Sequence, residues 1–74
     1  MPSETEYIVV FITTSSDNEA HKIAELLLGQ RKAACVNIVS GVDSSFWWQG
    51  KIDSARECLL IIKTKASVLP TVID

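Results

Sequence analysis

Hydrophobic residues follow three different spacings along the chain. Two continuous apolar runs, at residues 7–13 and 57–63, have the pattern of strands that are buried on both faces. Residues 34–40 alternate instead, as a strand with two unlike faces does. Between the first run and this strand, apolar residues recur at helical spacing, at Ala20, Ile23, Ala24, Leu27 and Leu28. The pattern therefore predicts the order strand, helix, strand, strand.

Capping and turn residues mark the ends of these elements. Ser16 and Glu19 have the spacing of a capping box, so we expect the helix to begin directly after Ser16. Gly41 predicts a bend or bulge in the second strand, after which residues 42–48 continue extended. The second and third strands then form the two arms of one long hairpin around Gly50.

The hairpin also predicts where the two cysteines lie. If Gly50 is the centre of the turn, Val42 faces Cys58 across the hairpin. Cys35 then lies about seven residues further along its strand, which is roughly 23 Å at 3.3 Å per residue. A disulfide needs Cα atoms within about 7 Å, so we expect no disulfide between Cys35 and Cys58 of one chain.

The order of elements is the first part of a ferredoxin-like split βαβ arrangement, which belongs to the α+β class. In that topology the third strand lies between the first and the second. Leu69, Val72 and Ile73 have helical spacing, so we expect a second helix to start near Ser67 or Leu69. A fourth strand would pair with the free edge of the first strand, but no residues remain to form it. We therefore expect residues 1–74 to be a single domain that is incomplete at its C-terminus.

Composition excludes several classes of function. A single core is marginal at 74 residues, and with 47% apolar residues this favours oligomerisation. The net charge of −2 and the scattered basic residues argue against nucleic-acid binding. The N-terminus is polar and acidic, and no apolar run approaches the length of a membrane span, so we expect neither a signal peptide nor a membrane partner. These features predict a cytoplasmic protein with reduced cysteines.

An apolar cluster lies at the tip of the predicted hairpin. Residues 44–51 include both tryptophans, and a tip on long arms cannot reach its own core. A stacking platform for a base or ring ligand would need flanking Arg or Lys, and only Lys51 is close. Adjacent Trp47 and Trp48 also point to opposite faces. We therefore interpret five residues as an oligomer interface, with Trp48 as the anchor: Phe46, Trp47, Trp48, Gly50 and Lys51.

Few residues are candidates for chemistry. Cys35 is the best candidate metal ligand, although we favour the interpretation that it is a small buried hydrophobe on its strand. His21 is the only histidine, and its spacing to Glu25 predicts no more than a solvated helix face, because a transition-metal site needs three or four ligands. No catalytic triad, phosphate loop or pair of catalytic carboxylates can be assembled, so we do not expect an enzyme.

Four segments carry a resemblance to a known family. They read IVVFITT at residues 8–14, KAACVNI at 32–38, WQGKI at 48–52 and ECLLIIKT at 57–64. With these segments in this order, the chain resembles the CutA family of divalent-cation tolerance proteins over nearly its whole length. The resemblance implies a trimer of ferredoxin-like subunits whose long hairpins extend between neighbours, with no established enzymatic reaction.

The resemblance also implies a function in tolerance of copper and other divalent cations. The family continues into a His-Pro-Tyr motif whose histidine is a proposed metal ligand, and that motif is not in this sequence. Some members carry a cysteine where this chain has Ile12, and an acidic residue where it has Gln49. We therefore expect a non-enzymatic homotrimer of metal-ion tolerance that binds copper or another divalent cation weakly, with Cys35 as the ligand.

Two other functions stay open. The first is a PII-like regulatory module that binds a small anionic effector at subunit clefts, with charge supplied by Lys51, Lys63 and Lys65. The second is an RNA-binding ferredoxin-like domain, which requires exposed aromatic residues on the first and third strands and a basic face. Residues 58–62 contain no aromatic residue, which disfavours it.

Overall fold

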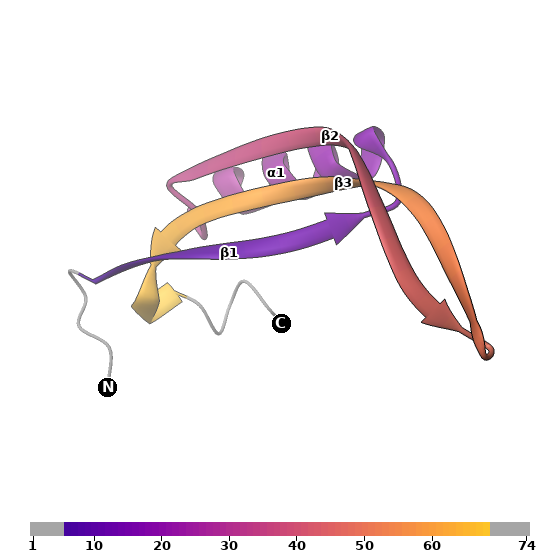
Figure 1. Ribbon diagram of the computed structural model, residues 1–74. Helices are drawn as coiled ribbons and strands as arrows, with labels where there is room; N and C mark the ends of the chain where they lie inside the picture. The colour runs from indigo at the N-terminus through magenta and orange to yellow at the C-terminus, as the bar shows by residue number, and fades with distance from the viewer. Residues whose placement is uncertain (1–5, 69–74) are drawn as a thin grey trace.

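The computed structural model describes residues 6–68, which form one helix packed on a three-stranded sheet (Figure 1). The elements in chain order are β1 (Tyr7–Thr14), α1 (Asp17–Gly29), β2 (Cys35–Trp48), β3 (Lys51–Lys65) and the 3-10 turn η1 (Ala66–Val68). The sheet order is β1-β3-β2, and β3 is antiparallel to both neighbours. The α+β class and the central position of the third strand are thus confirmed.

Helix α1 begins where the sequence predicts. Ser16 is extended, with φ −150°, and its hydroxyl accepts a hydrogen bond from the Glu19 N–H at 3.2 Å. The Glu19 carboxylate accepts a hydrogen bond from the Ser15 hydroxyl at 3.1 Å. At the other end of the helix, the Arg31 N–H donates to the Leu28 carbonyl and the Lys32 N–H donates to the Leu27 carbonyl. These two bonds close the last turn.

The core lies between α1 and the face of the sheet that it covers. Leu60 and Ile62 of β3 are fully buried there, because β3 is the central strand and the helix crosses above it. Small and aliphatic helix residues meet them and let the helix approach closely: Ala20, Ala24 and Leu27.

The other face of the sheet has no cover in the single chain. Side chains at paired positions share a face, which places eleven residues on this side, here called the open face: Tyr7, Val9, Phe11, Thr13, Cys35, Asn37, Val39, Leu59, Ile61, Lys63 and Lys65. Tyr7, Val9 and Phe11 are exposed, so burial of residues 7–13 on both faces is wrong for the single chain. The reason is that α1 covers only one face.

The hairpin turn contains two residues, Gln49 and Gly50. Both have positive φ, 49° and 76°, as the central residues of a type I′ turn do. The flanking pair is therefore Trp48 with Lys51, and Val42 faces Glu57. The prediction that Val42 faces Cys58 is wrong by one residue, because the turn is not centred on Gly50 alone.

The predicted bulge at Gly41 is confirmed. The register of β2 against β3 shifts between Val39 and Val42, and Gly41 has φ +70°, where glycine is favoured over residues with a Cβ. Beyond this point the two strands bend away from the sheet as a separate ribbon (Figure 1). The bulge therefore sets the direction of the hairpin tip.

The start of a second helix was expected near Ser67 or Leu69. Ser67 lies in η1, and residues from Leu69 onward lie outside the described residues. Over residues 6–68, no helix has the length and apolar character that crossing a membrane requires.

Candidate functional site

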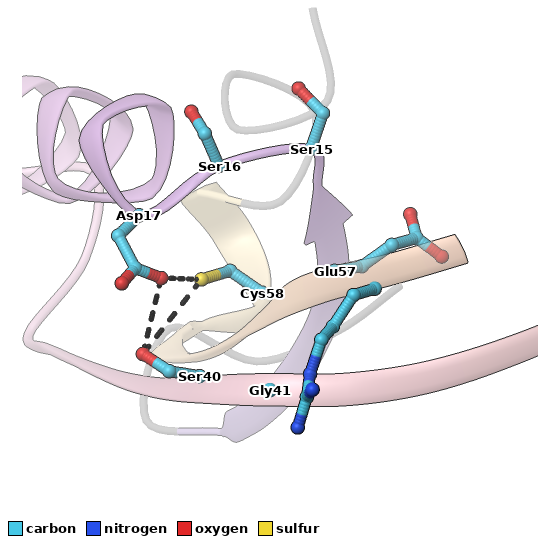
Figure 2. A pocket seen from close by; sticks show the side chains of 8 residues that line it. Ser15, Ser16, Asp17, Ser40, Gly41, Glu57 and Cys58 are labelled. Atoms are coloured by element: carbon cyan, nitrogen blue, oxygen red, sulfur yellow. Dashed lines mark hydrogen bonds between the residues drawn. The ribbon is translucent and has the colours of Figure 1, made fainter.

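A cavity of about 210 Å³ lies where α1 begins, beside the bulge in β2 (Figure 2). It is formed by three separate segments, which are the turn before α1, the bulge of β2 and the middle of β3. Its lining is mostly polar: Ser15, Ser16, Asp17, Ser40, Gly41, Arg56, Glu57 and Cys58.

Asp17 joins the three segments of this cavity. Its carboxylate accepts a hydrogen bond from the Ser40 hydroxyl at 3.1 Å and another from the Cys58 thiol. Figure 2 shows the three side chains converging, with the thiol also within 4.0 Å of the Ser40 hydroxyl. Sequence reasoning missed this cluster, because Ser40 and Cys58 are 23 and 41 positions from Asp17 and leave no local signal.

Hydrogen bonding moves the acidity of both groups in this cluster. The thiol of Cys58 and the hydroxyl of Ser40 lower the pKa of Asp17 below 3.8, because both donate to the ionised carboxylate. The same bond to Asp17, together with burial, raises the pKa of Cys58 above 9.0. Cys58 is buried and donates to Asp17, so in this geometry it acts as a structural hydrogen-bond donor.

The acidic side of this linkage gives a testable pH dependence. Because its pKa is lowered, Asp17 stabilises the fold above 3.8, and this contribution is lost as the pH falls through the lowered value. We expect wild type to be more stable than Asp17→Asn at neutral pH. The difference between their urea midpoints should shrink as the pH falls below 3.8. Asp43→Asn, in an exposed ion pair, is the control and should change the midpoint little.

The alkaline side has the opposite sign. Because the pKa of Cys58 is raised, its contribution is present below 9.0 and is lost as the pH rises toward the raised value. The urea midpoint of wild type should therefore exceed that of Cys58→Ala at neutral pH, by a margin that narrows at alkaline pH. A margin that stays constant to about pH 10.5 contradicts a thiol that donates to Asp17.

Cys35, the predicted metal ligand, lies elsewhere. It opens β2 on the open face, paired with Lys63, and its thiol is exposed and lies 3.9 Å from the Asn37 Oδ1. The favoured interpretation as a small buried hydrophobe is wrong for the single chain, because this face has no cover. The thiol is accessible to a soft metal ion.

The single chain does not assemble a complete metal site in the part that the structure describes. Residues 6–68 contain no group of three or more His, Cys, Asp or Glu side chains that could hold a metal ion. Both cysteines are free, and they lie on opposite faces of the sheet. His21 is exposed on α1 and contributes to the low pKa of Asp17 through its charge. Any metal bound at Cys35 therefore needs further ligands.

The predicted interface residues lie at the hairpin tip, as their sequence positions require. Trp47 and Trp48 are 72% and 60% exposed, and Phe46 and Lys51 are exposed beside them. Sequence reasoning missed Ile52, which is 69% exposed and directly faces Trp47 across the ribbon. The two-residue turn is the signal that would have found it, because it pairs Trp47 with Ile52. The tip thus presents apolar side chains on both of its faces.

The three lysines of the PII-like alternative are not brought together in one chain. Lys51 begins β3 at the tip, whereas Lys63 and Lys65 lie at its other end. Lys63 lies twelve residues after Lys51, which is roughly 40 Å measured along the strand at 3.3 Å per residue. Within the chain they form no common anion site.

Comparison with known proteins gives consistent results. The family described as CutA1 divalent ion tolerance protein matches residues 8–74. The "Divalent-cation tolerance protein CutA" of Archaeoglobus fulgidus is 45% identical over 65 residues, which are 88% of this chain and 63% of that protein. "Protein CutA 1, chloroplastic" of Oryza sativa is 44% identical over 62 residues, 84% of this chain and 35% of that protein.

A solved structure shows the same arrangement of elements. The "Divalent cation tolerance protein (Cut A1)" from Thermus thermophilus superposes with a TM-score of 0.86 at 42% identity, over 90% of this chain and 65% of that one. The chain therefore spans between about a third and two thirds of the length of these relatives.

Proposed function

The chain belongs to the CutA1 divalent ion tolerance protein family, and from that premise we propose that it acts as a homotrimer in divalent metal-ion tolerance. In this proposal it catalyses no reaction and binds copper, or another divalent cation, weakly. The observation that carries the proposal is the exposed thiol of Cys35 on the open face. A thiol is the ligand that soft metal ions prefer.

Assembly would supply the ligands that one chain lacks. In a closed trimer each site near the symmetry axis is repeated three times, so one thiol per chain becomes three. The open face and the hairpin tip both carry exposed apolar side chains that a neighbouring subunit would bury, among them Phe11 and Trp48. Oligomerisation would also supply the burial that a small, one-sided sheet lacks.

We place this function in the cytoplasm, since the two cysteines are free and that compartment keeps thiols reduced. The names of relatives include chloroplastic and periplasmic forms, and the chain spans only part of those proteins. Fractionation of the native cells, with immunodetection of the protein, tests the placement directly.

The metal proposal is tested by calorimetric titration of the purified protein with Cu²⁺ and with Zn²⁺ in excess Mg²⁺. We expect saturable binding by wild type and at least tenfold weaker binding by Cys35→Ser, because the soft ligand is lost; tenfold corresponds to about 1.4 kcal/mol. The thiol is exposed, so the variant should fold normally.

One control and two outcomes decide the test. His21→Ala removes the exposed helix histidine and should leave the affinity unchanged, since within residues 6–68 it belongs to no group of three or more potential ligands. Equal binding by wild type and Cys35→Ser would remove Cys35 from the site. Absence of saturable heat with both metals would remove metal binding from the proposal.

A further inference from the structure

A second cavity, of about 280 Å³, lies at the opposite end of the sheet from Asp17. It is found where β1 begins and where α1 and β3 end. Most of its lining is apolar or aromatic, with two basic side chains among the lining residues: Tyr7, Arg31, Ala33, Ala34, Thr64, Lys65 and Val68. Neither Cys35 nor the predicted interface residues at the hairpin tip line this cavity, although Tyr7 also belongs to the open face.

Positive charge is concentrated around this cavity. Four of the seven basic residues of the chain lie at this end, at Arg31, Lys32, Lys63 and Lys65. Within residues 6–68 the only ion pair joins Arg56 to Asp43, close to the bulge, so these four cations have no carboxylate of that part of the chain within 4.0 Å. Of the described residues, Glu6 is the acidic one at the same end, and its carbonyl accepts the Ala66 N–H. Among residues 6–68, four cations against one carboxylate give this end a positive balance.

The backbone holds Arg31 in an unusual conformation at the cavity. Arg31 has φ 57°, in the left-handed region just after the helix, where glycine is strongly preferred. Its N–H bonds to Leu28 O at 3.1 Å, and the following N–H bonds to Leu27 O at 2.8 Å. These two bonds complete a left-handed helix cap, which turns the chain after α1 toward the sheet and places Arg31 at the cavity.

The segment after Arg31 is also fixed against the sheet. The Thr64 hydroxyl donates to Lys32 O at 2.7 Å, and the Ala34 N–H donates to Lys63 O at 2.9 Å. These bonds tie the segment that carries Arg31 to the end of β3 that carries Lys65. The two cations therefore line one cavity from two segments that backbone and side-chain hydrogen bonds hold together.

We propose that this cavity binds a small organic anion through Arg31 and Lys65. The planar guanidinium offers two parallel donors to a carboxylate or phosphate, and the ammonium adds a second positive charge. The ring of Tyr7 and the side chains of Ala34 and Val68 contact the apolar part of the ligand. The volume lies just below the roughly 300–1,000 Å³ of sites for drug-sized molecules, so the ligand is smaller than those.

The test uses three probes of the same charge type in titrations followed by amide chemical shifts. Phenyl phosphate and benzoate each carry an oxyanion and a ring, whereas inorganic phosphate lacks the ring. We expect saturable shifts in the amides of residues 31–34 and 64–65, with tighter binding of the ring-bearing probes. A preference for phenyl phosphate or for benzoate then identifies the anionic group. Equal affinity for inorganic and phenyl phosphate would overturn the apolar half of the site.

Arg31→Gly separates binding from folding. Glycine suits the φ of 57°, so this variant should keep or raise the urea midpoint while it weakens phenyl phosphate binding at least tenfold. Lys65→Met should weaken binding in the same direction. Lys22→Met is the matched control, because Lys22 is an exposed cation on α1 outside the cavity lining. Unchanged affinity in Arg31→Gly, or no saturable shift with any probe at millimolar concentration, would overturn the proposal.

Discussion

Replacing Leu60 with alanine is expected to lower the free energy of unfolding by about 2–5 kcal/mol. Leu60 is 0% exposed, on the central strand, where it packs against α1. Truncation removes three carbon atoms from contact and leaves a cavity that β1 and β2 on either side cannot close without shifting. For a domain this small, such a loss is a large part of the total stability.

The measurement is urea denaturation followed by circular dichroism at several protein concentrations. Concentration matters, because assembly would add to the apparent stability by mass action. Leu26→Ala is the matched control: the same truncation at a helix position that is 56% exposed should change the unfolding free energy by no more than about 0.5 kcal/mol. An equal loss at Leu26 and Leu60 would contradict the position of the core.

The parts of the fold that the sequence predicted correctly depend on local or periodic signals. The Ser16 cap is a short-range hydrogen bond, and the Gly41 bulge needs a positive φ that glycine adopts without strain. The sheet order followed from the predicted split βαβ topology, in which the third strand lies between the first and the second. Each of these features could be read without knowing distant contacts.

The register of the hairpin was wrong because the turn is decided by a residue with no strong preference. Gln49 adopts φ 49°, which a residue with a Cβ seldom does, and this makes a two-residue turn with Gly50. A glycine in the sequence marks a turn but does not say whether it is the first, central or last residue. The shift of one residue also hid the pairing of Trp47 with Ile52.

The Asp17 cluster could not be predicted because its members are far apart in the sequence. Ser40 and Cys58 reach Asp17 only after β2 and β3 pair and α1 packs on them.

The exposure of Cys35 has a different origin. The residues of a strand are apolar wherever another surface covers them, including a surface of another chain. Apolar residues on both faces of β1 and β3 therefore fit the proposed trimer better than the single chain.

Replacing Trp48 with alanine is expected to dissociate the proposed trimer at concentrations where wild type stays assembled. Trp48 is 60% exposed at the end of a ribbon that the bulge turns away from its own sheet, so a neighbouring subunit is the surface that would bury it. Tryptophan at the centre of an interface commonly contributes about 2–4 kcal/mol, which is roughly a 30- to 900-fold change in affinity per contact.

Light scattering coupled to size exclusion over a dilution series measures this change as a mass that falls from three chains toward one. The fold of the released subunit should persist, because Trp48 has no part in the core beneath α1. His21→Ala, exposed on α1 and far from the tip, should keep the mass of wild type. A Trp48→Ala protein that remains trimeric at every dilution would show that the tip is not the assembly element, and the apolar residues of the open face would then have to hold the subunits together without it.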